Sequence, residues 1–159
     1  MAIVVGTNSY ITRVEADTYW SDRANAVWAA ASDAAKDAAL YESAAYLDGH
    51  YSWIGTLEDT AQLLGWPRTG ATDNEGRTVT GVPSKVEDSQ AELALQALSG
   101  SLVPSQAKDD TRTKKEKVGE IEVEYFDNSS IGRVYDYVDL LLTGLYDNGR
   151  VNVVELVRA

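Results

Sequence analysis

The chain has 159 residues, of which 44% are hydrophobic, and this suits one domain with a real core. It has no cysteine, so neither a disulfide framework nor a thiolate metal site is available. Aspartate and glutamate outnumber lysine and arginine by 25 to 14, and the net charge of −11 opposes long-range attraction to nucleic-acid phosphates. No signal-peptide pattern and no apolar run of about 18 residues occurs, so we expect a soluble cytoplasmic product.

The first half of the chain predicts two helices. Thr12 and Glu15 have the spacing of a capping box, in which each side chain satisfies an unpaired N–H of the first helical turn. The apolar residues that follow predict a short helix to about Asp22. Ser32 then precedes an alanine-rich stretch that predicts a second helix ending near Gly49.

Residues 50–82 differ from this pattern, because five glycines and a proline interrupt every repeat of apolar residues that could indicate a helix or a strand. We expect a long ordered loop there, with room for a small hairpin. Ser84 and Glu87 then form a second candidate capping box, and the helix that it starts should end near Gly100.

Residues 101–127 predict an extended arm. The run 108–117 is polar and has no hydrophobic period, whereas residues 120–125 alternate strictly between polar and apolar side chains. The alternation predicts a strand with Ile121, Val123 and Tyr125 on one face and Glu120, Glu122 and Glu124 on a solvated face.

A fourth helix is predicted within 131–147, since Val134, Val138, Leu142 and Leu145 share one face. The last ten residues, 150–159, are rich in β-branched side chains and too short to fold alone, so we expect them to add a strand to another chain. The fold class is therefore mainly α: a small four-helix bundle with an extended β arm or hairpin and a C-terminal β tail. The single domain would have a helical core of about 12–100 and 131–147.

Few residues indicate catalytic or metal chemistry. His50 is the one histidine, and we expect it to have a surface or packing role. Asp73–Gly76 superficially resembles a calcium loop, but Arg77 and Ser84 stand where that motif needs oxygen ligands, which favours an ordinary turn. We therefore expect no enzymatic activity, no metal and no cofactor.

Trp66, Pro67 and Arg68 allow two interpretations. A tryptophan beside a proline and an arginine is a common anchor of protein interfaces. The same tryptophan could instead pack over the core of the bundle, and the sequence does not choose between these.

Two sets of segments carry a family resemblance. Val4–Tyr10 with Glu15–Asp17, Gly65–Gly70, and Val82–Pro83 with Glu92–Leu95 together resemble phage proteins labelled DnaT-like single-strand-binding proteins. Lys114–Tyr125, followed by Leu140–Leu145, resembles head-tail connector proteins of tailed bacteriophages, also called adaptor or head-completion proteins.

The connector resemblance implies a structural subunit of the virion neck, made in the host cytoplasm. It would form a ring, typically twelve-fold, with the portal protein and tail or stopper proteins as partners, no membrane contact, and DNA only passing through its channel. The candidate interface residues are Trp66, Pro67, Arg68, Lys114, Lys115, Ile121, Val123, Tyr125, Val151, Val153, Leu156, Val157 and Arg158. The candidate channel-facing residues are Glu120, Glu122 and Glu124.

The alternative is a DnaT-like protein that binds single-stranded DNA in replication. Such a protein needs a basic groove and exposed aromatic rings on which bases stack. The chain has 4 Trp and 9 Tyr, but its basic residues cluster only in 112–117, next to Asp109 and Asp110. Because basic residues are so few and so close to acidic ones, we expect the protein to be a head-tail connector.

Overall fold

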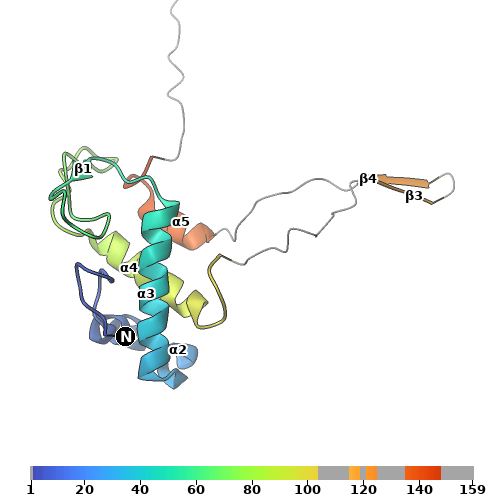
Figure 1. Ribbon diagram of the computed structural model, residues 1–159, viewed down its shortest axis with the longest axis horizontal. Coiled ribbons are helices and arrows are strands. Elements are labelled where there is room, and N and C mark those ends of the chain that lie inside the picture. Colours follow the sequence, from blue (N-terminus) through green and yellow to red (C-terminus); the bar gives the residue numbers. More distant parts are fainter. Residues whose placement is uncertain (1, 104–114, 119–120, 125–134, 148–159) are drawn as a thin grey trace, which may run out of the picture.

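The computed structural model describes residues 2–103, 115–118, 121–124 and 135–147. These residues contain five helices and two two-stranded antiparallel sheets (Figure 1). The predicted fold class, mainly α with a small β hairpin, is confirmed.

Helix α1 (Arg13–Asp22) begins and ends where the sequence predicts. The Thr12 hydroxyl accepts from the Glu15 N–H at 3.2 Å, and the Thr12 N–H donates to the Glu15 carboxylate at 2.6 Å, which confirms the capping box. The sequence did not predict helix α2 (Ala26–Ala30). It has five residues, too few to show a helical period, and it buries Trp28.

Helices α3 (Asp33–His50) and α4 (Ser84–Ala97) form the centre of the molecule. The Ser32 hydroxyl caps α3 as predicted, accepting from the Ala35 N–H at 3.3 Å. The predicted capping box of α4 is wrong, because Pro83 occupies the cap position and no side chain caps this helix. The fixed φ of proline suits a helix boundary, and Ser84 becomes the first helical residue.

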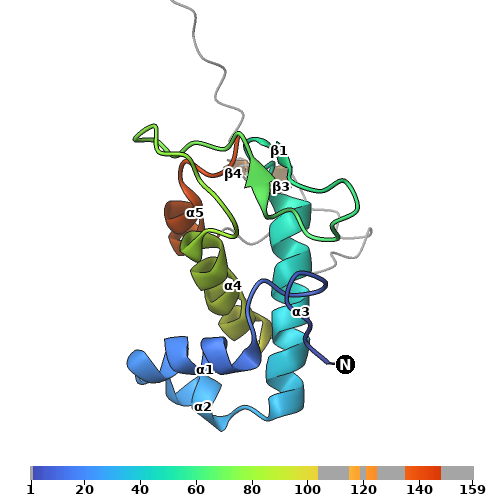
Figure 2. The ribbon, with the colours of Figure 1, turned by 90° about the vertical axis from the view of Figure 1, so that its left-hand side faces the viewer.

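Helix α4 packs against α3, α5 and α1, and α2 packs against α1 (Figures 1 and 2). Helices α1 and α2 cover one end of α3, where Trp20, Trp28 and Leu40 belong to one buried cluster. Helix α5 and the long loop lie at the other end, beside a second cluster that includes Leu47 and Trp66. Helix α4 contributes buried residues to both clusters and so joins the two ends.

One buried amide holds the N-terminal segment against α3 and α4. The Gln90 side-chain oxygen accepts from the N–H groups of Tyr10 at 2.8 Å and Ile11 at 3.1 Å. Its nitrogen donates to the Ser9 hydroxyl at 2.7 Å and to the Leu40 carbonyl at 2.9 Å. All four hydrogen-bonding positions of a fully buried amide are therefore satisfied.

The long loop contains the small hairpin that we considered, formed by β1 (Thr56–Leu57) and β2 (Arg68–Thr69). The predicted turn at Asp73 is also confirmed. Its carboxylate accepts from the N–H groups of Glu75 at 3.0 Å and Arg77 at 2.9 Å.

Helix α5 (Asp136–Leu142) is shorter than predicted. Val138 and Leu145 are buried, as the predicted apolar face requires, but Leu145 lies in the turn after the helix. Gly144 ends the helix with φ of +87°, and a Cβ there would lie 2.7 Å from the Asn74 side chain. The chain therefore turns at Gly144, where the long loop packs against it through Asn74.

The arm contains β3 (Lys115–Val118) paired with β4 (Ile121–Glu124), and the pair stands clear of the helices in Figure 1. This confirms the predicted strand over 121–124 and supplies its return strand. The register places Lys115 opposite Glu124 and Lys117 opposite Glu122. Each glutamate of β4 therefore has a lysine opposite it in the hairpin.

Candidate nucleic-acid interface

Several basic side chains of the helical body pair with carboxylates. Arg13 lies 3.2 Å from Asp33 and 3.1 Å from Asp37. The Lys36 ammonium is nearly buried and lies 2.8 Å from the Asp17 carboxylate. Burial would raise the pKa of Asp17, but hydrogen bonds from Lys36 and from the Trp28 ring lower it below its usual value.

Arg68, a predicted interface residue, is turned toward its own loop. Its guanidinium donates to the backbone carbonyls of Ile54 at 2.7 Å, Gly55 at 2.8 Å and Gly65 at 3.1 Å. The Arg68 side chain therefore stabilises the loop that contains β1 and β2. Its proposed role at an interface stays a prediction.

Trp66 is 1% exposed and belongs to the core, which agrees with the packing interpretation of the Trp66–Pro67–Arg68 segment. The segment is anchored to α3 through Asp48. One oxygen of this carboxylate accepts from Tyr10 and from the Trp53 ring, and the other accepts from the Gly65 N–H at 2.9 Å. Pro67 follows Trp66 through a cis peptide bond and is half-buried.

The remaining basic side chains of the body are Arg23, Arg77 and Lys85. Arg23 lies 3.5 Å from the centre of the Tyr19 ring, and Arg77 pairs with acidic neighbours in its turn. Lys85 is exposed on α4. Residues 1–103 contain six basic and fourteen acidic residues, a net charge of −8, so the body is a poor surface for phosphates.

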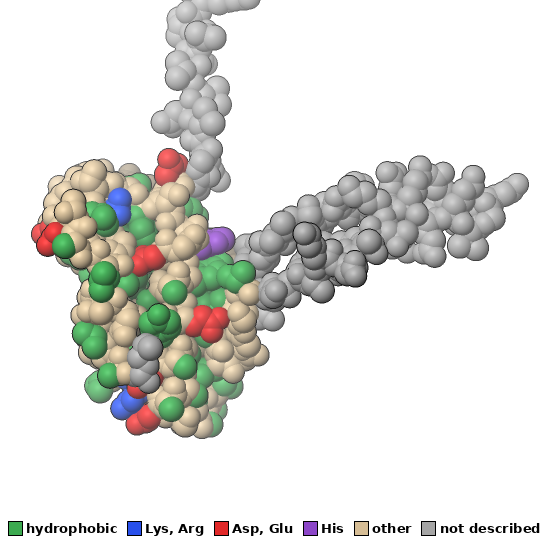
Figure 3. Space-filling view, in the orientation of Figure 1, with side chains coloured by type: hydrophobic (Ala, Val, Ile, Leu, Met, Phe, Trp, Pro, Cys, Tyr) green, Lys and Arg blue, Asp and Glu red, His purple; other side chains and the backbone are tan. Residues whose placement is uncertain are grey.

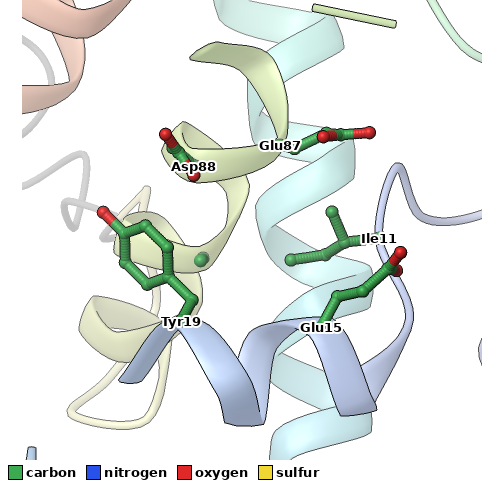
Figure 4. Close-up of a pocket in the computed structure, with 6 residues that line it drawn as sticks. Ile11, Glu15, Tyr19, Glu87 and Asp88 are labelled. Carbon is green, nitrogen blue, oxygen red and sulfur yellow. The ribbon is translucent and has the colours of Figure 1, made fainter. Parts of the chain in front are cut away.

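A small hollow of about 110 Å³ lies between α1 and α4 (Figure 4). Its lining residues are Ile11, Glu15, Tyr19, Glu87, Asp88 and Ala91. Burial raises the pKa of Glu87, with the charge of Glu15 adding to it, and burial also raises the pKa of Asp88. Among the described residues no group of carboxylates and imidazole could hold a metal ion. The hollow is acidic and should repel an anionic ligand.

The other end of the body carries a row of rings, of which the sequence had drawn attention only to His50, for a surface or packing role. The His50 ring stacks on Tyr46 with centres 4.9 Å apart and planes 15° from parallel. Tyr135 meets Tyr46 edge-on at 5.6 Å, and Tyr51 contacts both His50 and Tyr146 at 4.9 Å. We call these five residues the aromatic strip. The histidine lies at the surface next to hydrophobic side chains (Figure 3).

The strip is assembled from three parts of the chain. Tyr46, His50 and Tyr51 come from the end of α3 and the residue after it, whereas Tyr135 and Tyr146 flank α5. The i, i+4, i+5 spacing of the first three could have indicated a shared aromatic surface. No local pattern links them to the two later tyrosines.

The other predicted interface residues and the predicted channel-facing glutamates lie in or beside the arm and in the tail. The β3–β4 hairpin contains the interface candidates Lys115, Ile121 and Val123 and the channel-facing candidates Glu122 and Glu124. The residues that lie outside the described part of the chain are Lys114, Glu120, Tyr125, Val151, Val153, Leu156, Val157 and Arg158. The predicted docking of 150–159 is therefore not tested.

A family model described as "Putative DnaT-like ssDNA binding protein" matches residues 2–159. The chain belongs to this family. The comparisons found no match among curated proteins and none among solved structures.

The family match overturns the head-tail connector interpretation and supports the alternative. The twelve-fold ring, the portal, tail or stopper partners, and DNA that only passes through a channel were wrong. The channel role of Glu120, Glu122 and Glu124 loses its basis too, and the register places lysines opposite two of them.

The physical error was to treat the net charge as if it were spread evenly over the molecule. Charges separated by more than about 8 Å are largely screened at physiological salt, so a local basic segment can act independently of an acidic body.

No helix in the described ranges is both long and apolar enough to cross a membrane. The absence of enzymatic activity and the location in the virion stay predictions.

Proposed function

We propose that this protein binds single-stranded DNA. The observation that carries the proposal is the family match, which spans residues 2–159 and names this ligand. The resemblance carried by Val4–Tyr10, Gly65–Gly70 and Glu92–Leu95 made the same suggestion from the sequence. Binding alone would account for this role, with no catalytic step.

The distribution of charge supports a local rather than a global binding surface. In the body, Arg13, Lys36 and Arg77 pair with carboxylates, and Arg68 is bound to backbone carbonyls. By contrast, the ten positions 108–117 contain five basic and three acidic residues. This segment has a local excess of positive charge, and Lys115 and Lys117 fall in strand β3. The register sets Glu124 and Glu122 opposite these two lysines, so the phosphate site that we propose is the whole run 108–117, where basic residues outnumber acidic ones.

The test is a titration of a fluorescein-labelled oligothymidylate with the full chain, followed by fluorescence anisotropy at salt concentrations between about 50 and 200 mM. A duplex of the same length is the matched control. We expect the single strand to bind at least about tenfold more tightly than the duplex, with an affinity that falls as salt rises. Equal affinity for the duplex, or no binding at the lowest salt, would overturn the proposal.

A further inference from the structure

We propose that bases of the bound strand stack on the aromatic strip, with the His50 ring as the outermost platform. This inference rests on the proposed function and deepens it by assigning the surface that contacts the bases. Stacking on aromatic rings is how many proteins bind single strands without reading their sequence.

His50 has the geometry of a stacking platform. One face of its imidazole lies on Tyr46, Tyr51 meets it at 79°, and the side chain is still exposed. Tyr46 is only 8% exposed, so it supports the histidine from below rather than competing for a base. A nucleobase on the open side would continue a stack that the protein has already begun.

The rings beneath and beside His50 are held in place before any ligand arrives. The Tyr51 hydroxyl donates to the Asp139 carboxylate at 2.6 Å, and the Tyr135 hydroxyl donates to the Leu102 carbonyl at 3.3 Å. Burial, and then the hydrogen bond to Asp139, raise the pKa of Tyr51 far above its usual value, so this ring stays uncharged. A preformed site loses little conformational entropy on binding.

The strip also lies between two residues that flank the arm in the sequence. Leu102 precedes the arm and Tyr135 follows it, and their hydrogen bond brings these two residues together beside Tyr46. Bases on the strip would therefore place their phosphates close to where the chain leaves for Lys115 and Lys117 and returns. Asp139 faces the strip as well, but its carboxylate is engaged by Tyr51.

Exposed aromatic residues elsewhere on the body lack this arrangement. Tyr41 is 47% exposed on α3, and within the described residues no ring contact involves it. It therefore provides a matched control: an exposed ring of similar size on the same helix, outside the strip.

The experiment compares His50→Leu, His50→Phe and Tyr41→Leu in the full chain, using the anisotropy titration with oligothymidylate and a thermal melt of each variant. Leucine keeps apolar bulk but removes the π face, and phenylalanine restores it. Loss of one stacking contact, about 1–3 kcal/mol, corresponds to about 5- to 150-fold weaker binding. We expect that loss for His50→Leu, near-complete recovery for His50→Phe, and no change for Tyr41→Leu.

The outcomes separate the two proposals. If the unchanged protein binds the oligonucleotide and folded His50→Leu binds equally well, the strip is not the base platform, while the proposed function stands. A folded His50→Phe variant as weak as His50→Leu would also overturn the stacking inference. If the unchanged protein does not bind, both proposals fail.

Discussion

The helical body and the β3–β4 hairpin distribute charge in different ways. In the body, Arg13 and Lys36 lie within 3.2 Å of carboxylates from other helices or turns, and these pairs help to join α1 to α3. In the hairpin, the register of two four-residue strands sets Lys115 opposite Glu124 and Lys117 opposite Glu122. The net charge of a chain therefore does not show which charged side chains pair within the fold and which are available to bind a ligand.

The two regions should therefore respond differently to substitution. Changes to the buried or paired polar groups of the body should reduce its stability. Changes to the lysines of the hairpin should reduce ligand binding and leave the stability of the body unchanged.

The largest expected effect on stability is that of Gln90→Leu. The substitution replaces the amide with an apolar side chain of similar size and leaves the N–H groups of Tyr10 and Ile11 without partners, whereas the Leu40 carbonyl still accepts from the Ser43 hydroxyl. Each buried unpaired group costs about 1–3 kcal/mol, so we expect the free energy of unfolding to fall by about 2 kcal/mol or more. Urea denaturation measures this directly.

The matched control is Gln96→Leu, an exposed glutamine on the same helix, for which we expect a change within about 0.5 kcal/mol. Equal stabilities for the two variants would show that the buried amide does not hold the N-terminal segment.

A smaller effect should distinguish the two candidate capping boxes. Thr12→Ala removes a side chain that caps α1 and should reduce the free energy of unfolding by about 1 kcal/mol. Ser84→Ala should have almost no effect, since Ser84 is the first residue of α4 and makes no cap hydrogen bond. Thermal melts of both variants measure the difference. A larger loss for Ser84→Ala would mean that the cap of α4 is wrongly placed.

Local signals in the sequence predicted two helices well, although the equally local capping box at Ser84 was wrong. The caps at Thr12 and Ser32 and the apolar stripes behind them define α1 and α3 within one or two residues. Prediction failed where an element is too short to show a pattern or where its end depends on contacts with residues far away in the sequence. Helix α2 is too short to show a period, and α5 ends where Asn74, far away in the sequence, packs against Gly144.

The candidate site was likewise only partly visible in the sequence. The cluster of basic residues was visible in the sequence, but the acidic net charge led us to predict against DNA binding there. The aromatic strip was not visible, since it combines the end of α3 with residues on both sides of α5. Trp66 could not be assigned from sequence, because an interface anchor and a core residue have the same local pattern.

The most direct test of the central claim, that the hairpin lysines bind phosphates of a single strand, is the titration repeated with the double variant Lys115→Gln and Lys117→Gln. Lys85→Gln removes one exposed lysine from the body as a control, and the double change to arginine keeps both charges. We predict weaker binding and a salt dependence reduced by about 0.7 per glutamine substitution, with unchanged melting of the body. The arginine and Lys85 variants should bind normally. A glutamine double variant with unchanged affinity and salt dependence would contradict the account.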